Sequence, residues 1–165
     1  MAEVTDKPAS FEMADIEAFL LDEADLLDQR RFDEWRDLFD EDGYYWVPLR
    51  PGQDNPDDEV SLFFDDRNTM ATRFARLEHP RIHSQSPPTR ALRIVANIRI
   101  EDTDNEACTV VSKLIMVDYR QGEQRLFAGR VRHRLRRTPD GLLIAWKKVE
   151  LINCDDVFGV VAVPF

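Results

Sequence analysis

RLFAGRVRHRLRRTPDGLLIAWKKVELI, residues 125–152, is the stretch of sequence that decides the fold. It contains two runs rich in β-branched and other apolar residues, 125–137 and 142–152, and such runs are typical of β-strands. Pro139 and Gly141 lie between them, where proline presets one turn dihedral and glycine accepts a positive φ. We therefore predict that the two strands form an antiparallel hairpin.

Two further strands are expected before this hairpin. Residues 92–100 alternate with a period of two, which is the period of a strand. Leu92, Ile94, Ala96, Ile98 and Ile100 fall on one side, and Arg93, Val95, Asn97 and Arg99 fall on the other. The run TVVSKLIMVDYR, residues 109–120, has the same strand-like composition. The second half of the chain is thus predicted to form a mainly antiparallel sheet.

The first half of the chain shows the spacing of helices. Ile16, Phe19, Leu20 and Leu27 recur at intervals of three, four and seven, which predicts an amphipathic helix over about residues 11–29. The other expected elements are a short helix at 32–39 ended by Gly43, a strand at 44–49, a polar loop at 51–59, a helix at 65–77 and a loop at 79–90. Helices followed by antiparallel strands predict an α+β domain, with the N-terminal helices packed on one face of a curved sheet.

Length and charge limit the possible functions. The 165 residues suit a single domain, 1–165, with residues 1–10 as a flexible N-terminus. The net charge is −10, and residues 1–66 hold 21 acidic against 5 basic side chains, whereas residues 67–165 hold 11 against 17. This balance disfavours nucleic acid and anionic membranes as partners. The acidic start and the lack of an 18-residue apolar run predict a cytoplasmic protein without a membrane span.

Metal and redox motifs are missing from the sequence. His79 and His83 stand four residues apart, but Pro80 argues against the helix that would bring them together on one face. Cys108 and Cys154 are too few for a disulfide framework and form neither C-x-H nor C-x-x-H. We therefore expect no metal, no cofactor and no catalytic residue on this chain.

Four arginines, Arg130, Arg132, Arg134 and Arg136, alternate along one predicted strand and project from one sheet face, while Val131, His133 and Leu135 project from the other. Four guanidinium groups on one face repel one another unless carboxylates neutralise them. Two interpretations stay open, namely a solvated face with a few salt bridges and a face that contacts another subunit.

Aromatic residues cluster at Tyr44, Tyr45 and Trp46. They are explained either by core packing of the strand against a helix or by a pocket. In a pocket, Tyr44 or Tyr45 would be a proton donor, with His83 as base and Asp25 from the first helix. The spacing alone does not favour catalysis.

Several motifs together resemble the small (β) subunit of aromatic ring-hydroxylating dioxygenases. They are the first-helix motif EADLLD (23–28), WRDLFDEDGYYWVP (35–48), the helix opening DDR (65–67), and PPTR (87–90) preceding the strand VANIRI (95–100). The resemblance extends over about residues 14–165. It implies a cone-shaped fold of the ketosteroid isomerase and scytalone dehydratase type, with a strongly bent sheet around the helices.

The resemblance also implies a function and partners. A large (α) subunit would carry the Rieske [2Fe-2S] cluster and the mononuclear Fe(II), with the β chains forming a threefold base in an α3β3 hexamer. NADH would supply electrons through a reductase, often with a ferredoxin, and dioxygen would be added to an aromatic ring to give a cis-dihydrodiol. This chain would then be a non-catalytic, structural subunit in aromatic catabolism.

Subunit contacts are expected at the arginine strand and at the apolar tail, residues 157–165. The tail residues Val160, Val161, Val163 and Phe165 would form an exposed apolar patch if they were left in water. The alternative function is a stand-alone isomerase or dehydratase, or a small-molecule binding protein, of the same cone fold. It would need an open cavity, whereas a cavity filled by Trp35, Phe39 and leucine side chains would leave no room for a substrate.

Overall fold

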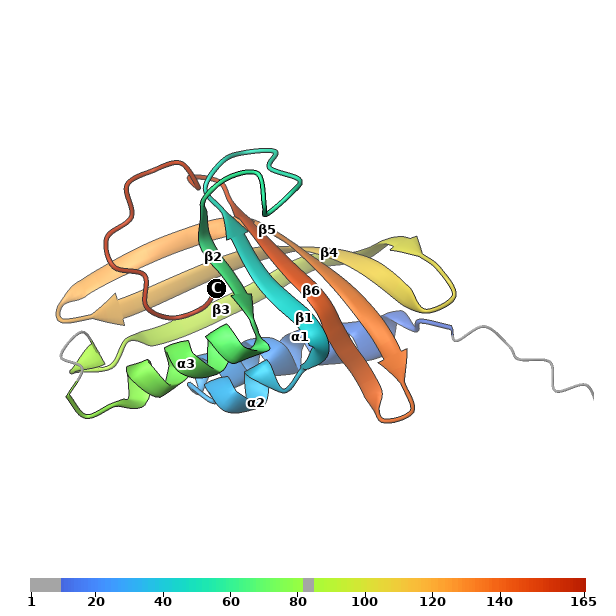
Figure 1. Ribbon diagram of the computed structural model, residues 1–165, viewed down its shortest axis with the longest axis horizontal. Coiled ribbons are helices and arrows are strands. Elements are labelled where there is room, and N and C mark those ends of the chain that lie inside the picture. Colours follow the sequence, from blue (N-terminus) through green and yellow to red (C-terminus); the bar gives the residue numbers. More distant parts are fainter. Residues whose placement is uncertain (1–9, 82–84) are drawn as a thin grey trace, which may run out of the picture.

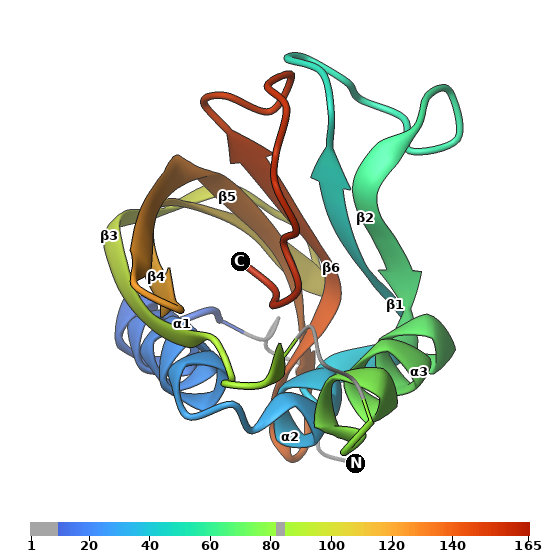
Figure 2. The same ribbon diagram turned by 90° about the vertical axis from the view of Figure 1, so that its left-hand side faces the viewer.

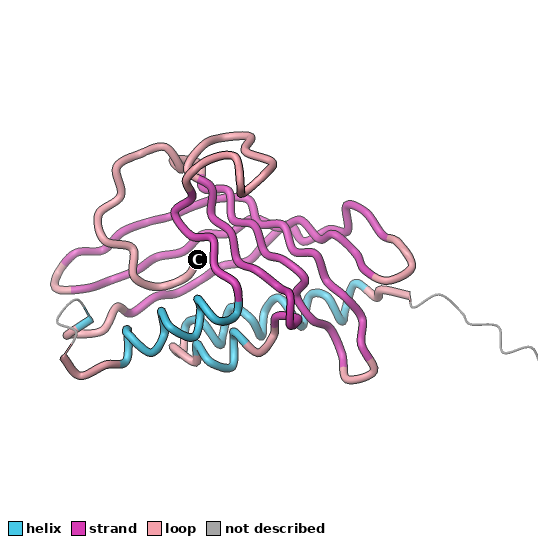
Figure 3. Tube along the Cα trace, viewed as in Figure 1, coloured by secondary structure: helices cyan, strands magenta, loops and turns pink. Residues whose placement is uncertain are grey.

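The computed structural model describes residues 10–81 and 85–165, so residues 1–9 of the predicted flexible N-terminus lie outside the described residues. Figures 1 and 3 show helices lying along one side of a sheet, which confirms the α+β class. The helices are α1 (Met13–Asp28), α2 (Phe32–Arg36) and α3 (Arg67–Glu78). The strands are β1 (Phe39–Pro48), β2 (Ser61–Asp66), β3 (Arg90–Thr103), β4 (Ala107–Arg120), β5 (Glu123–Thr138) and β6 (Gly141–Leu151).

The strands form one sheet in the order β2-β1-β6-β5-β4-β3. All neighbouring pairs are antiparallel except β1 with β6. The predicted hairpin is confirmed, because β5 and β6 pair from Thr138 opposite Gly141, where Gly141 has a φ of 131°. Figure 2 shows that the sheet curls around an interior, with the helices closing one side and the C-terminal segment running inside the curve.

Two glycines allow the close approach of strands in this bend. A Cβ at Gly129 of β5 would lie 2.5 Å from the Glu150 carbonyl oxygen, and one at Gly43 of β1 would lie 2.7 Å from that of Ile144. Any side chain at either position would collide with the neighbouring backbone. The expectation that Gly43 ends the second helix is therefore wrong: α2 ends at Arg36, and Gly43 lies within β1.

A strand was missed just before the third helix. Residues Ser61–Asp66 form β2, which pairs with β1, and the helix begins only at Arg67. Two adjacent aspartates suggested a helix start, and one of them provides it, because the Asp66 carboxylate accepts a hydrogen bond from the Thr69 N–H at 2.7 Å. Asp65 instead lies in the strand and pairs with Arg73 at 2.6 Å.

The alternation in β3 reverses partway along the strand. Leu92 and Ile94 point outward and are 61% and 56% exposed, while Arg93 is buried. The ladder with β4 is irregular after Ala96, and Asn97 has a positive φ of 54°. Such a bulge exchanges the two faces of a strand. The predicted single apolar face of residues 92–100 is therefore wrong, although the strand itself is confirmed.

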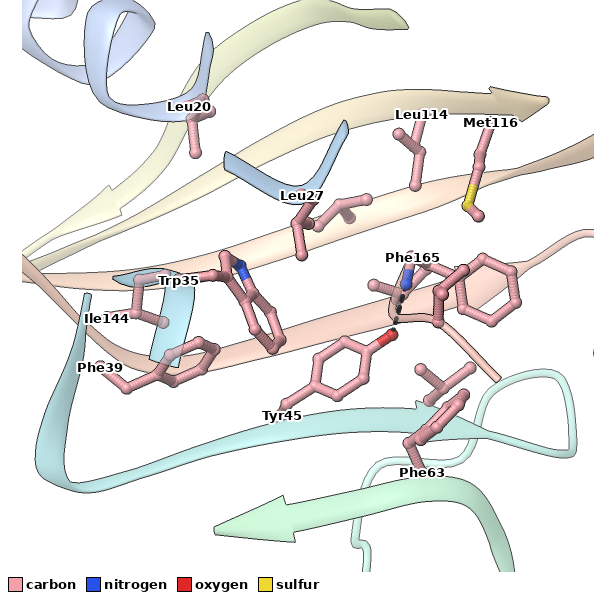
Figure 4. Packing of buried hydrophobic residues seen from close by; sticks show 14 of the residues in the cluster. Leu20, Leu27, Trp35, Phe39, Tyr45, Phe63, Leu114, Met116, Ile144 and Phe165 are labelled. Atoms are coloured by element: carbon pink, nitrogen blue, oxygen red, sulfur yellow. Dashed lines mark hydrogen bonds between the residues drawn. The ribbon is translucent and has the colours of Figure 1, made fainter. Parts of the chain in front are cut away.

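The core lies between the curled sheet and α1. Trp35 packs edge-on against Tyr45, with ring centroids 5.3 Å apart, and Phe127 packs against Phe165 at 5.1 Å. Figure 4 shows Trp35, Tyr45 and Phe165 meeting at the centre of this packing. The interior of the cone is thus filled by side chains that come from both ends of the described chain.

Candidate functional site

The interior of the cone is the first place where this fold could hold a substrate. A residual cavity of about 20 Å³ remains there, lined by Glu23, Arg93, Ser112, His133 and Lys147 together with apolar residues of α1 and the sheet. A cavity of this size has room for about one water molecule, whereas one that admits benzene is on the order of 150 Å³. This cavity, as the described residues line it, therefore cannot hold an aromatic ring without rearrangement.

The C-terminal segment fills the rest of the interior. The Tyr45 hydroxyl accepts a hydrogen bond from the Phe165 N–H at 2.9 Å, the dashed line in Figure 4. The Lys147 ammonium donates to the Phe165 carbonyl oxygen at 3.0 Å, and the Arg93 guanidinium donates to that of Pro164. These bonds satisfy buried backbone groups that would otherwise be costly to remove from water.

A buried charge cluster surrounds Glu23 of α1. Its carboxylate accepts hydrogen bonds from Lys147 at 2.7 Å and from the Trp35 indole N–H at 2.9 Å, and lies 2.8 Å from His133 Nε2. Burial alone would raise the pKa of Glu23, but Lys147 and His133 together outweigh it and hold that pKa below its usual range. Burial lowers the pKa of Lys147, and Glu23 opposes that effect. Glu23 and Lys147 are thus an ion pair.

Arg93 carries a second buried charge, which is neutralised from the same helix. Its guanidinium contacts the Asp28 carboxylate at 2.6 Å, and its backbone N–H donates to that carboxylate at 3.2 Å. This links β3, the end of α1 and the C-terminal segment through one side chain. The cluster around Glu23 and this pair lie where acid–base chemistry would be placed, but they hold the chain's own C-terminal segment.

Among the described members of the acid–base set considered from the sequence, Tyr44, Tyr45 and Asp25 do not converge. Tyr45 faces the interior, whereas its neighbour Tyr44 lies on the outer face and packs against the Phe64 ring at 5.5 Å. Asp25 is exposed on α1. His83 lies outside the described residues. The interpretation of the aromatic cluster as core packing holds for Tyr45, which is 1% exposed.

The arginine strand has the predicted alternation, since Val131, His133 and Leu135 are buried on the opposite face. Three of its arginines pair with carboxylates of this chain: Arg132 with Glu101 and Glu150, Arg134 with Asp104, and Arg136 with Asp40 and Asp42. Arg130 is exposed and makes no ion pair within residues 10–81 and 85–165. The salt-bridge interpretation therefore describes three positions, and a contact role stays a prediction.

The tail is only partly on the surface. Val163 and Phe165 are 3% and 0% exposed, Val161 packs against the core, and Val160 is 77% exposed. Val163 and Phe165 are therefore covered by this chain itself, because the backbone bonds described above draw the segment inward. The contact role of the tail stays a prediction.

The sequence carried a signal for the buried charges. Glu23 follows Ile16 and Leu20 on the buried side of α1, and Lys147 alternates with Ala145 and Val149 in β6. A charged residue at a core position is rarely buried without a partner, so these two could have been paired. Arg93 could not have been assigned to the core, because the bulge at Asn97 reverses the two faces of β3 and the sequence does not reveal it.

Among residues 10–81 and 85–165, no group of histidine, cysteine, aspartate and glutamate side chains is arranged to hold a metal ion. No helix in the described part of the chain is long and apolar enough to cross a membrane. Cys108 and Cys154 are both buried as free thiols.

Comparisons with known proteins agree on one family. A family model described as "Ring hydroxylating beta subunit" matches residues 22–155. The small oxygenase component of the p-cumate 2,3-dioxygenase system of Pseudomonas putida is 31% identical over 137 residues, which is 82% of this chain and 76% of that protein. The crystal structure of the benzoate 1,2-dioxygenase β subunit from Burkholderia mallei superposes with a TM-score of 0.75 and 29% identity, over 87% of this chain and 93% of that one.

The fold extends to more distant proteins. An NTF2-like protein with a cystatin-like fold from Novosphingobium aromaticivorans has a TM-score of 0.61 at 16% identity, over 85% of this chain and 81% of that one. At this identity the similarity concerns the fold alone. It supports the expected cone-shaped architecture.

Proposed function

The chain belongs to the family of ring-hydroxylating dioxygenase β subunits, and we propose on that premise that it is the structural small subunit of a multicomponent aromatic ring-hydroxylating dioxygenase. In this proposal it supports the large subunit and contributes no reacting group. The observation that carries the proposal is the occupied interior: among the described residues the cavity beside Glu23 measures about 20 Å³, and the Tyr45, Arg93 and Lys147 side chains bind the chain's own tail. Ligand pockets commonly measure about 300–1,000 Å³.

The chemistry belongs to the partner. We place the Rieske [2Fe-2S] cluster and the mononuclear Fe(II) on a large (α) subunit, which adds dioxygen to an aromatic compound with electrons from NADH. A reductase, with or without a ferredoxin, would deliver those electrons, and the supply of NADH implies the cytoplasm. The proposed assembly is an α3β3 hexamer, in which a C3 arrangement gives each β chain the same contacts.

The large subunit needs an apolar surface on this chain. Four apolar side chains in the β1–β2 loop and in the segment after β6 are exposed, and we call them the mouth surface: Val60, Ile152, Val157 and Val160, which are 78%, 81%, 94% and 77% exposed. Large exposed apolar patches mark contact sites, and we propose that these side chains become part of one when the large subunit binds. The buried tail residues Val163 and Phe165 would act indirectly, by anchoring the segment that carries Val157 and Val160.

A reconstitution experiment tests the proposal. The chain is co-expressed with its large subunit, and the complex is measured by size-exclusion chromatography with light scattering and by NADH-dependent oxygenation. We expect Val157→Asp with Val160→Asp to abolish co-elution, and Thr103→Asp, a change at an exposed position of the β3–β4 hairpin, to leave it intact. Full oxygenation by the large subunit without this chain, or turnover by this chain alone, would refute the proposal.

The stand-alone isomerase or dehydratase is the second candidate. The buried Glu23, His133 and Lys147 cluster is the observation in its favour, because acid–base groups with such surroundings often mark active sites. The C-terminal segment occupies the place of the substrate, however. This candidate requires turnover by the purified chain after the segment is removed, and the structural role requires none.

A further inference from the structure

The outer face of the sheet carries an apolar area that no other described element covers. Leu92, Ile94, Ile115 and Leu126 are 61%, 56%, 43% and 67% exposed, and we call them, with Lys113 and Arg130, the sheet surface. They form continuous cross-strand rows, because Leu92 pairs through Val117 with Leu126, and Ile94 pairs with Ile115. The helices cover the opposite face (Figures 1 and 2). A sheet face that meets water is normally polar, so this one is expected to be covered.

Two cations adjoin the apolar rows without an ion-pair partner among the described residues. Lys113 of β4 stands directly opposite Arg130 of β5, and both are exposed. Neither makes an ion pair among the described residues, and Glu150, which faces Arg130 from β6, is engaged by Arg132 at 2.9 Å and Lys148 at 3.2 Å. Like charges directly opposite on neighbouring strands are destabilising. Carboxylates from another molecule would therefore stabilise the pair.

The same chain presents a surface of opposite charge on α1. This helix contains six acidic and no basic residues. Two of the acids, Glu23 and Asp28, are neutralised inside the fold. The others include an exposed group that we call the helix surface, formed by Glu17, Leu21, Asp22 and Asp25. Leu21 is 51% exposed, and the three acids of this surface make no ion pair among the described residues.

The two surfaces match in charge and spacing. Asp22 and Asp25 are three residues apart, which places their Cβ atoms roughly 5–6 Å apart on a helix. Opposed residues such as Lys113 and Arg130 have Cβ atoms roughly 4.5–5.5 Å apart on a sheet. Leu21 lies beside the acids as Ile115 lies beside the cations. We infer that the sheet surface of one copy binds the helix surface of a second copy of this chain.

This contact is heterologous, because the two surfaces differ, and a heterologous contact that closes generates a ring. The inference rests on the proposed function, since it identifies the β–β contact of the proposed hexamer. It leaves the mouth surface free for the large subunit. The two sets of residues do not overlap, so they can be tested separately.

Charge reversal tests the pairing in the purified chain and in the complex with the large subunit. We expect Lys113→Glu with Arg130→Glu to weaken self-association by about 100-fold or more, because like charges then meet across the contact. Asp22→Lys with Asp25→Lys is expected to do the same. Combining all four changes should restore association, and Arg81→Glu, an exposed charge reversal elsewhere, should have no effect. Circular dichroism and thermal melting confirm that each variant folds.

Three results would overturn the inference. The wild-type chain could make no contact with another copy of itself, either alone or in the complex with the large subunit. The two charge-reversal variants could associate as the wild type does, or the variant with all four changes could stay dissociated. Loss of large-subunit binding in the Lys113 and Arg130 variant, with self-association intact, would also overturn it by assigning the sheet surface to that partner. The proposed function fails on different evidence, namely oxygenation that does not depend on this chain.

Discussion

Replacing Lys147 by methionine removes the main partner of a buried carboxylate while keeping the length of the side chain. Glu23 and Lys147 are 3% and 4% exposed, and their ion pair measures 2.7 Å. Breaking a buried pair from one side costs about 3–5 kcal/mol, because the remaining charge is left in a poorly solvated site. We expect Lys147→Met to lower the free energy of unfolding by that amount near neutral pH.

The loss should depend on pH with a defined sign. In the wild type the pKa of Glu23 lies below its ordinary value of 4.5, so its contribution is present above pH 4.5 and is lost as acid protonates the folded state. Without Lys147, burial dominates and raises that pKa, although His133 still faces the carboxylate. The variant then loses stability as pH rises through the raised pKa. Its deficit should be larger at about pH 8 than at about pH 5.

Urea unfolding followed by circular dichroism at both pH values measures the deficit. Adding Glu23→Gln removes the stranded charge but keeps an acceptor for the Trp35 and His133 groups. The double variant should therefore be more stable than Lys147→Met and nearly independent of pH in this range. A deficit below about 1 kcal/mol, or one that does not change with pH, would refute the assignment of a buried ion pair.

Three further changes have clear expected outcomes. Phe165→Ala should reduce the free energy of unfolding by about 3–5 kcal/mol in denaturant titrations, because the ring is fully buried. Val160→Ala, at an exposed site, should change it by less than about 0.5 kcal/mol. Equal effects of the two changes would contradict the anchored tail. Gly129→Ala should lower the melting temperature, since its Cβ would lie 2.5 Å from a backbone oxygen, while Gly159→Ala, with no neighbour closer than 3.9 Å, should not. Arg136→Met removes the ion pairs with Asp40 and Asp42 and should lower the free energy of unfolding by about 1 kcal/mol or less in the same titration. A markedly larger loss of that free energy would show that these ion pairs hold the fold together.

The architecture was largely predictable because its elements carry strong local signals. The hairpin around Pro139 and Gly141 and the stripe of α1 follow from turn chemistry and periodicity. The orientation of β3 did not follow, because a bulge at Asn97 reverses its faces, and a bulge is set by pairing with β4 rather than by local sequence. β2 was missed because it is only six residues long and ends in Asp65 and Asp66, which resemble a helix start.

The site was less predictable than the fold. Tyr45 could be assigned to the core, but its bond to Phe165 joins residues 120 positions apart, which no local pattern reveals. The burial of the tail likewise depends on Arg93 and Lys147, whose partners are backbone carbonyls without a sequence signature. A hydrophobic tail indicates a buried segment, but not whether its own chain or a partner buries it.

The central claim is that this chain gives the oxygenase its shape and none of its chemistry. The turnover rate per assembled large subunit, measured with the chain carrying both Glu23→Gln and Lys147→Met, tests it most directly. We predict a rate equal to that of the wild-type assembly once the complex has formed. A markedly lower rate in an intact complex would mean that the buried cluster takes part in the reaction.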